Sequence, residues 1–190
     1  MKKVLNVIIG IFLCLTLVAC GETCEHVNTS VSYEKGDLLN VVKITTCKDC
    51  EEVLEEKDLT SVEYVYNKEV LNSNGIKVTI DNLTIDGWEF VTLNFTVEGT
   101  SGKARTFETT QIYVNDVDTS AWVYVDELSN NKKSKQTHYI YEEISADDFF
   151  RNQDYEVEII YSISTSIFDV LETDTISFNL NEFTSIKDHE

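Results

Sequence analysis

The segment over residues 155–163 constrains the fold of this 190-residue chain more than any other part of its sequence. Its odd positions are all apolar or aromatic, and its even positions are mostly polar. Successive side chains of a β-strand point to opposite faces, so this alternation predicts a strand with one buried and one exposed face. The chain therefore needs a sheet with a one-sided hydrophobic core.

Other segments between residue 61 and the C-terminus share this β-rich character. Turn residues stand between them, including the pairs Asn74-Gly75 and Asp86-Gly87. Short strands at this spacing favour an antiparallel β-sandwich over an alternating α/β fold. We expect a single short helix in this region, over 146–152, with Ser145 as its N-cap. The further strands are predicted over 62–70, 76–80, 88–97, 105–114, 120–125, 136–143 and 175–180.

The first twenty residues are of a different kind. Two lysines precede an apolar run over residues 4–19. This run has the charged and apolar regions of a secretory signal and is shorter than the roughly 20 apolar residues of a membrane-spanning helix. It ends Leu-Val-Ala-Cys, which resembles the lipobox of bacterial lipoproteins. The resemblance implies that residues 1–20 are a lipoprotein signal ending at Cys20, which is acylated and anchors the chain on the extracytoplasmic face of the cell membrane.

Three cysteines and one histidine follow, as Cys-x-His and then Cys-x-x-Cys. Three thiols cannot all pair with one another, whereas three cysteines and one histidine supply the four ligands of a closed tetrahedral zinc site. The Cys-x-x-Cys spacing is that of a zinc knuckle, a tight turn that points two thiolates at one ion. We therefore expect a structural zinc held by Cys24, His26, Cys47 and Cys50.

The residues between the two halves of this motif predict a hairpin, with strands over 27–33 and 38–46. A hairpin with a knuckle resembles a zinc ribbon, and the resemblance covers about residues 24–60. Many ribbons have glycine after the second knuckle cysteine, where this chain has Glu51. A module over 21–60 is too small to bury a sufficient core, so zinc would contribute to its folding.

Two other uses of the cysteines remain open at this point. A disulfide can join Cys47 to Cys50, or Cys24 to one of them. Alternatively, the Cys-x-x-Cys is a redox site, which normally has its first thiol at a helix N-terminus. The run over 51–56 is a possible short helix that would suit the redox interpretation.

The order of features after residue 61 also resembles an immunoglobulin-like domain found in secreted lipoproteins of Gram-positive bacteria. The stretches that carry it are 76–99, 113–116 and 143–150 leading into 155–163. The resemblance implies an immunoglobulin-like β-sandwich over 61–190. The family supplies no catalytic residues to transfer.

Charge limits the partners. The chain has 34 acidic and 15 basic residues and a net charge of −19, so nucleic acid would be repelled and is not an expected partner. The sequence lacks the nucleophile and zinc-protease motifs Gly-x-Ser-x-Gly and His-Glu-x-x-His. We therefore expect a non-enzymatic surface protein that binds an envelope or extracellular partner, with ligand-binding residues unknown. The alternative is an extracytoplasmic thiol-disulfide or metal-handling protein.

Three minor features complete the candidates. Exposed aromatic residues are a possible ligand platform, acidic residues are a possible calcium site, and His138 is interpreted as a surface histidine. Core or cross-strand packing and a solvated surface are the commoner roles for the aromatic and acidic groups. The platform residues are Trp88, Trp122, Tyr113, Tyr124, Tyr139 and Tyr141, and the acidic residues are Asp116, Asp118, Asp147 and Asp148.

Overall fold

The structure is a computed structural model. It describes residues 24–37, 40–88, 90–119, 122–140, 149–150, 154–165, 169–183 and 185–190. Cys20, the rest of the predicted signal and most of the helix predicted over 146–152 lie outside these residues. The described part is mostly β, with all strand pairs antiparallel, as the sequence predicts. No helix among the described residues has the length and apolarity to cross a membrane.

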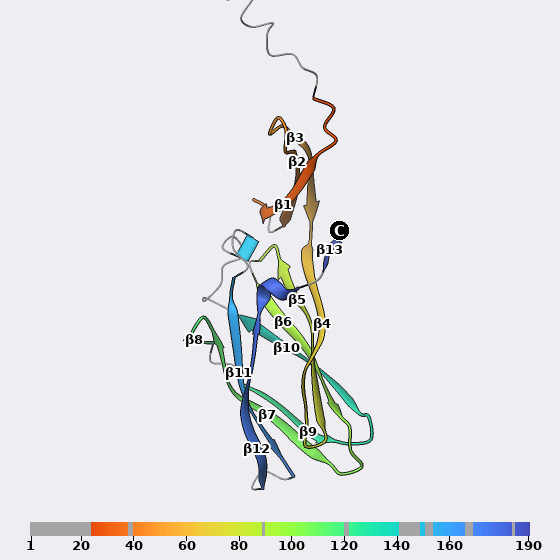
Figure 1. The fold of residues 1–190 in the computed structure, drawn as a ribbon, viewed down its shortest axis with the longest axis vertical. Coiled ribbons are helices and arrows are strands. Elements are labelled where there is room, and N and C mark those ends of the chain that lie inside the picture. The colour runs from red at the N-terminus through yellow and green to blue at the C-terminus, as the bar shows by residue number, and fades with distance from the viewer. Residues whose placement is uncertain are drawn as a thin grey trace, which may run out of the picture.

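A small sheet opens the described chain at one end of the long axis (Figure 1). Its strands are β1 (Thr29–Lys35), β2 (Val41–Cys47) and β3 (Val53–Leu59), in that order. We call it the N-terminal sheet. The predicted hairpin is present as β1 and β2, but the short helix considered over 51–56 is wrong. Pairing of β3 with β2, from Val41 opposite Leu59 onward, outweighs the local helix propensity of this glutamate-rich run.

Two larger sheets form the rest of the fold. The β5 sheet contains β10 (Lys133–Ile140), β6 (Val91–Gly99), β5 (Ile76–Asp86), β4 (Ser61–Ser73) and β13 (Ser185–His189), in that order. The β11 sheet contains β12 (Val170–Asn179), β11 (Glu156–Ser164), β7 (Arg105–Val114) and β8 (Val117–Asp118), and β9 (Val123–Leu128) also pairs with β7. A 3-10 turn, η1 (Leu180–Glu182), links β12 toward β13.

The two larger sheets bury their apolar faces in one shared core. In β11, the alternation predicted from the sequence is confirmed, because Val157, Ile159, Tyr161 and Ile163 are all buried. Side chains of the two sheets meet directly, as where the ring of Tyr66 in β4 lies 5.7 Å from that of Phe178 in β12. Each such side chain contributes about 1.5–3 kcal/mol on burial.

Two connections between strands use residues that accept a left-handed backbone. Asn74 and Gly75 join the paired strands β4 and β5 with φ values of 47° and 83°. Two consecutive positive φ values define the hairpin turn whose twist matches that of paired strands, so the turn predicted at Asn74-Gly75 is confirmed. Asn130 and Asn131, with φ values of 51° and 63°, lie between β9 and β10, which belong to different sheets, so this connection passes from one large sheet to the other.

The N-terminal sheet joins the larger sheets without a linker, since only Thr60 separates β3 from β4. Val41 and Leu59 belong to the shared core. The C-terminal strand β13 adds polar contacts, because Asp188 accepts hydrogen bonds from the Tyr33 hydroxyl at 3.0 Å and from Lys43 Nζ at 2.5 Å. The N-terminal sheet is thus fixed to the larger sheets in two ways: by the direct connection from β3 to β4, and by the contacts of Asp188 in β13.

This contact predicts a pH-dependent stability. Burial raises the pKa of Asp188, but Lys43 and Tyr33 outweigh it and hold that pKa below its usual range. A carboxyl with a lowered folded pKa stabilises the fold above its unfolded value, about pH 4, and loses this contribution as pH falls further. We expect Asp188→Asn to cost about 1–2 kcal/mol in urea unfolding at pH 7 and much less at pH 3.

Asp116→Asn is the matched control, because Asp116 is exposed in a turn where asparagine tolerates the left-handed backbone. It should leave the unfolding midpoint unchanged at both pH values. An equal loss for Asp188→Asn at pH 7 and pH 3 would contradict the role given to this ion pair.

Candidate metal site

The four residues predicted as metal ligands come together at the end of the N-terminal sheet that lies away from the shared core. Their ligand atoms all lie within 4.8 Å of one another. Cys24 and His26 precede β1, Cys47 ends β2, and Cys50 lies in the turn between β2 and β3. Register explains the meeting, because Thr29 at the start of β1 pairs with Cys47.

The distances suit a tetrahedral metal ion. The Sγ atoms of Cys24 and Cys47 are 3.3 Å apart, and Cys50 Sγ is 3.6 Å from His26 Nδ1. Zinc bonds of about 2.3 Å to sulfur and 2.0 Å to nitrogen place tetrahedral ligand atoms about 3.5–3.8 Å from one another. All three cysteines are free thiols, and no Sγ pair is at the roughly 2.0 Å of a disulfide. The cluster is therefore compatible with a zinc site.

The knuckle turn forms in spite of its glutamate. Glu51 N donates to Cys47 O at 2.9 Å, and Cys47 N donates to Glu52 O at 2.9 Å, which closes the turn between β2 and β3. Glu51 has a φ of 60°, the left-handed backbone for which many zinc ribbons have glycine. A non-glycine residue adopts this conformation at a cost of about 1 kcal/mol. The turn geometry is retained, and Glu51 carries the strain.

The two paired thiols have opposite pKa shifts. Burial raises the pKa of Cys47, but hydrogen bonds from the Asp49 backbone N–H, the Cys24 thiol and the Cys50 backbone N–H bring it down to about 6. The pKa of Cys24 is raised to about 11, because the facing Cys47 and Cys50 sulfurs outweigh a lowering hydrogen bond from the His26 backbone. Of these two thiols, Cys47 is the one more readily converted to the thiolate that metals bind.

His26 presents its two ring nitrogens to different partners. Nδ1 faces the cysteine cluster, and Nε2 lies 3.6 Å from Glu52 Oε2. Metal-binding histidines commonly have a carboxylate near the second nitrogen, which fixes the ring orientation and raises its basicity. The sequence alone does not indicate this role for Glu52. Its only signal is that Glu52 belongs to the pair of glutamates directly after Cys50.

The predicted aromatic platform does not form as one surface. Trp122 and Tyr124 stack on each other in and beside β9, with ring centroids 5.8 Å apart. Tyr139 lies in β10 of the other large sheet, where its ring meets Phe90 edge-on. Tyr141 lies outside the described residues. The aromatic residues therefore divide between two sheets.

Two other interpretations change with the structure. His138 is partly buried and not simply a surface histidine as expected, and this burial lowers its pKa to about 4. Its Nε2 lies 3.1 Å from Thr119 Oγ1. In the described part of the chain, Asp116 and Asp118 join no group of three metal ligands, and Asp147 and Asp148 lie outside it.

Comparison with known proteins gives no relative: no family model, no curated protein and no solved structure matches this chain. Its function must therefore be inferred from its own geometry.

The strained turn yields a prediction. Glu51→Gly should raise the free energy of unfolding by about 0.5–1 kcal/mol, because glycine adopts a positive φ without steric cost. Glu55→Gly is the control, since Glu55 is an exposed position in β3 and glycine there should destabilise by a similar amount. Chemical denaturation measures both. A destabilising Glu51→Gly would argue against a left-handed residue in the knuckle.

Proposed function

We propose that this chain is a lipid-anchored, non-catalytic binding protein of the cell surface, in which a structural zinc holds the N-terminal sheet and an immunoglobulin-like sandwich presents the binding surface. The observation that carries this proposal is the four-ligand cluster of Cys24, His26, Cys47 and Cys50. Four protein ligands fill a tetrahedral zinc site and leave no position for a substrate, which is typical of structural zinc.

The exposure of the N-terminal sheet supports a structural role for the metal. Most residues of β1 and β3 are exposed, and the buried residues of the sheet are Val41, Cys47 and Leu59. Val41 and Leu59 lie at the end next to the shared core, so the opposite end has little apolar burial to hold it. A structural zinc contributes about 10–16 kcal/mol of apparent binding energy, enough to fix that end.

Strand order supports the immunoglobulin-like assignment. In one sheet β12, β11, β7 and β8 are neighbours, and in the other β10, β6 and β5 are neighbours. If β5 is taken as strand A, these orders correspond to G-F-C-C′ and E-B-A of the immunoglobulin fold. β4 and β13 would then extend the second sheet beyond strand A.

The anchor and the zinc cluster are close in sequence, because residues 21–23 alone separate Cys20 from Cys24. A lipid at Cys20 would hold the cluster near the membrane surface. Seven-residue strands at about 3.3 Å per residue make the N-terminal sheet about 20 Å long. The sheet would then act as a stiff spacer that carries the two larger sheets away from the lipid headgroups.

The three histidines support a non-catalytic role. His26 belongs to the cluster, the partly buried His138 lies 3.1 Å from Thr119 Oγ1, and His189 lies 3.1 Å from Glu63 Oε2. Each is therefore engaged in a structural contact, as is each of the cysteines Cys24, Cys47 and Cys50.

Metal content is the first test. The chain from Gly21 to Glu190 should contain one zinc ion by elemental analysis, and its three thiols should react only after a chelator is added. His26→Ala should lose most of the zinc and unfold at a lower temperature, whereas His189→Ala should retain it. A metal-free chain with a single reactive thiol would contradict the zinc site and indicate a disulfide.

Lipidation is tested separately in a bacterial host fed an alkyne-tagged fatty acid. The full chain should take up the label and sediment with membranes, because two or more acyl chains bind a bilayer stably. Cys20→Ala should lose the label. Cys14→Ala, the matched change within the signal, should keep it. Membrane-bound but unlabelled chain would rule out the lipid anchor.

A thiol-disulfide function is the second candidate. It is favoured by the 3.3 Å separation of the Cys24 and Cys47 sulfurs and by the exposure of Cys50. Such a protein would reduce a model disulfide, and Cys47→Ser would abolish the activity. Full activity in Cys47→Ser would exclude this candidate.

A further inference from the structure

A polar groove crosses the outer face of the β5 sheet, away from the zinc cluster. It has a volume of about 430 Å³ and is formed by four strands, β4, β5, β6 and β10. This volume can accommodate a few sugar-sized groups, and it lies within the range of volumes typical of ligand sites. The residues lining it include Asn67, Asp81, Asn82, Asn94, Thr96 and Lys135.

Two breaks in strand pairing form this groove. The register of β4 against β5 shifts between Val65 and Lys68, and the register of β5 against β6 shifts between Ile80 and Asn82. Asn67 and Asp81 are among the residues that the shifts leave out of the pairing, and Asn67 has a left-handed φ of 50°. Bulges bend a strand and redirect its side chains, and they are frequent beside functional sites.

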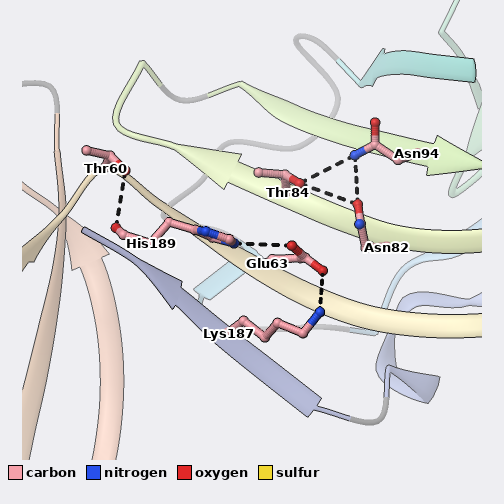
Figure 2. A network of polar contacts seen from close by, with 7 residues as sticks. All are labelled: Thr60, Glu63, Asn82, Thr84, Asn94, Lys187 and His189. Atoms are coloured by element: carbon pink, nitrogen blue, oxygen red, sulfur yellow. Dashed lines mark hydrogen bonds and ion pairs between the residues drawn. The ribbon is translucent and has the colours of Figure 1, made fainter.

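Hydrogen bonds hold the groove side chains in place. Asn94 Nδ2 donates to Asn82 Oδ1 at 2.7 Å, and Thr137 Oγ1 donates to Asn94 Oδ1 at 2.9 Å. Figure 2 shows Asn82, Thr84 and Asn94 joined in this way on neighbouring strands. Their orientation is therefore fixed before a ligand binds, which lowers the entropic cost of binding.

Bonding capacity remains after these contacts. No described residue bonds to the Asn82 amide nitrogen or to Lys135 Nζ, and Asp81 uses one oxygen, which accepts from Thr96 Oγ1 at 2.7 Å. Donors and acceptors thus stand side by side. A sugar hydroxyl both donates and accepts, so vicinal hydroxyls match this arrangement.

Local charge narrows the class of ligand. Among its lining residues the groove has one carboxylate, Asp81, and one ammonium, Lys135, and the others are neutral amides and hydroxyls. The net charge of −19 on the whole chain disfavours polyanions. A cationic ligand would meet Lys135 within the groove. The match is best for a neutral ligand rich in hydroxyl groups.

Exposed aromatic rings continue the groove toward the N-terminal sheet. On β10, Thr137 pairs with Asn94 and Tyr139 pairs with Thr92, so Tyr139 is the next residue on the face that carries Thr137. Tyr139 is 44% exposed and meets Phe90, and Trp88, in the same turn as Phe90, is 63% exposed. An aromatic face packs against the apolar C–H face of a sugar ring while neighbouring amides bind its hydroxyls.

We propose that this groove and the adjacent Tyr139 bind a neutral oligosaccharide along β10. This inference rests on the proposed binding function and specifies its ligand class. The groove would bind hydroxyl groups through Asn82, Asp81 and Lys135, and the next sugar would stack on Tyr139.

Calorimetric titration of the full chain in detergent tests the proposal. The probes are neutral hexasaccharides of glucose, mannose and N-acetylglucosamine, with a sulfated hexasaccharide for comparison. At least one neutral probe should bind, and the sulfated one should bind much more weakly. Asn82→Ala, Lys135→Ala and Tyr139→Ala should each weaken binding about tenfold or more.

Matched controls lie outside the groove. Asn72→Ala changes an exposed asparagine of β4, and Trp122→Ala changes an exposed aromatic residue of the other sheet. Both should bind like the unchanged chain. Thermal melting of every variant establishes that lost affinity is not lost folding, and Lys135→Ala leaves the asparagine network intact.

Three results would overturn the inference: no neutral probe binds, the sulfated probe binds more tightly, or Trp122→Ala and not Tyr139→Ala removes binding. Sedimentation of the chain with isolated cell envelopes separates this failure from that of the proposed function. Chain that binds envelopes but no sugar would retain a binding function with another ligand. Chain that binds neither would lose both.

Discussion

Burial of two alternating strand faces in one core is the constraint on which the rest of this structure depends. β5 and β6 on one side and β11 on the other place apolar side chains inward at nearly every second position, and β4, β7 and β12 add further buried side chains to the same core. Once those faces meet, the outward positions are free to carry polar residues. The side chains of the groove on the β5 sheet occupy such outward positions, because they alternate with buried core residues of the same strands.

The N-terminal sheet is stabilised differently at its two ends. Val41 and Leu59 extend the shared core into one end, and Asp188 binds Tyr33 and Lys43 there. At the other end four ligand atoms gather, with a strained Glu51 in the turn that orients them. A candidate metal site and a hydrophobic core thus lie at opposite ends of one sheet, an arrangement consistent with the spacer that we propose.

Much of the fold follows from the sequence, and the exceptions have physical causes. β7 was predicted over 105–114 and has these bounds, because its alternating pattern and flanking turns are local. β13 was not predicted, because Ser185–His189 contains one apolar residue, Ile186, and forms an edge strand through backbone pairing with β4. The 51–56 run was considered as a helix, because the local preference of its glutamates does not reveal the neighbouring strand β2.

By itself, the sequence determined the β class, the main turns and the identity of the four candidate ligands, because alternation, the Asn-Gly and Asp-Gly pairs and the Cys-x-x-Cys spacing act over a few residues. Tertiary structure alone decided that Glu52 stands behind His26 and that the predicted aromatic residues divide between two sheets. It also decided the groove, whose residues lie far apart in the chain and meet through strand pairing. The bulges that shape it depend on register between strands, which no local pattern specifies.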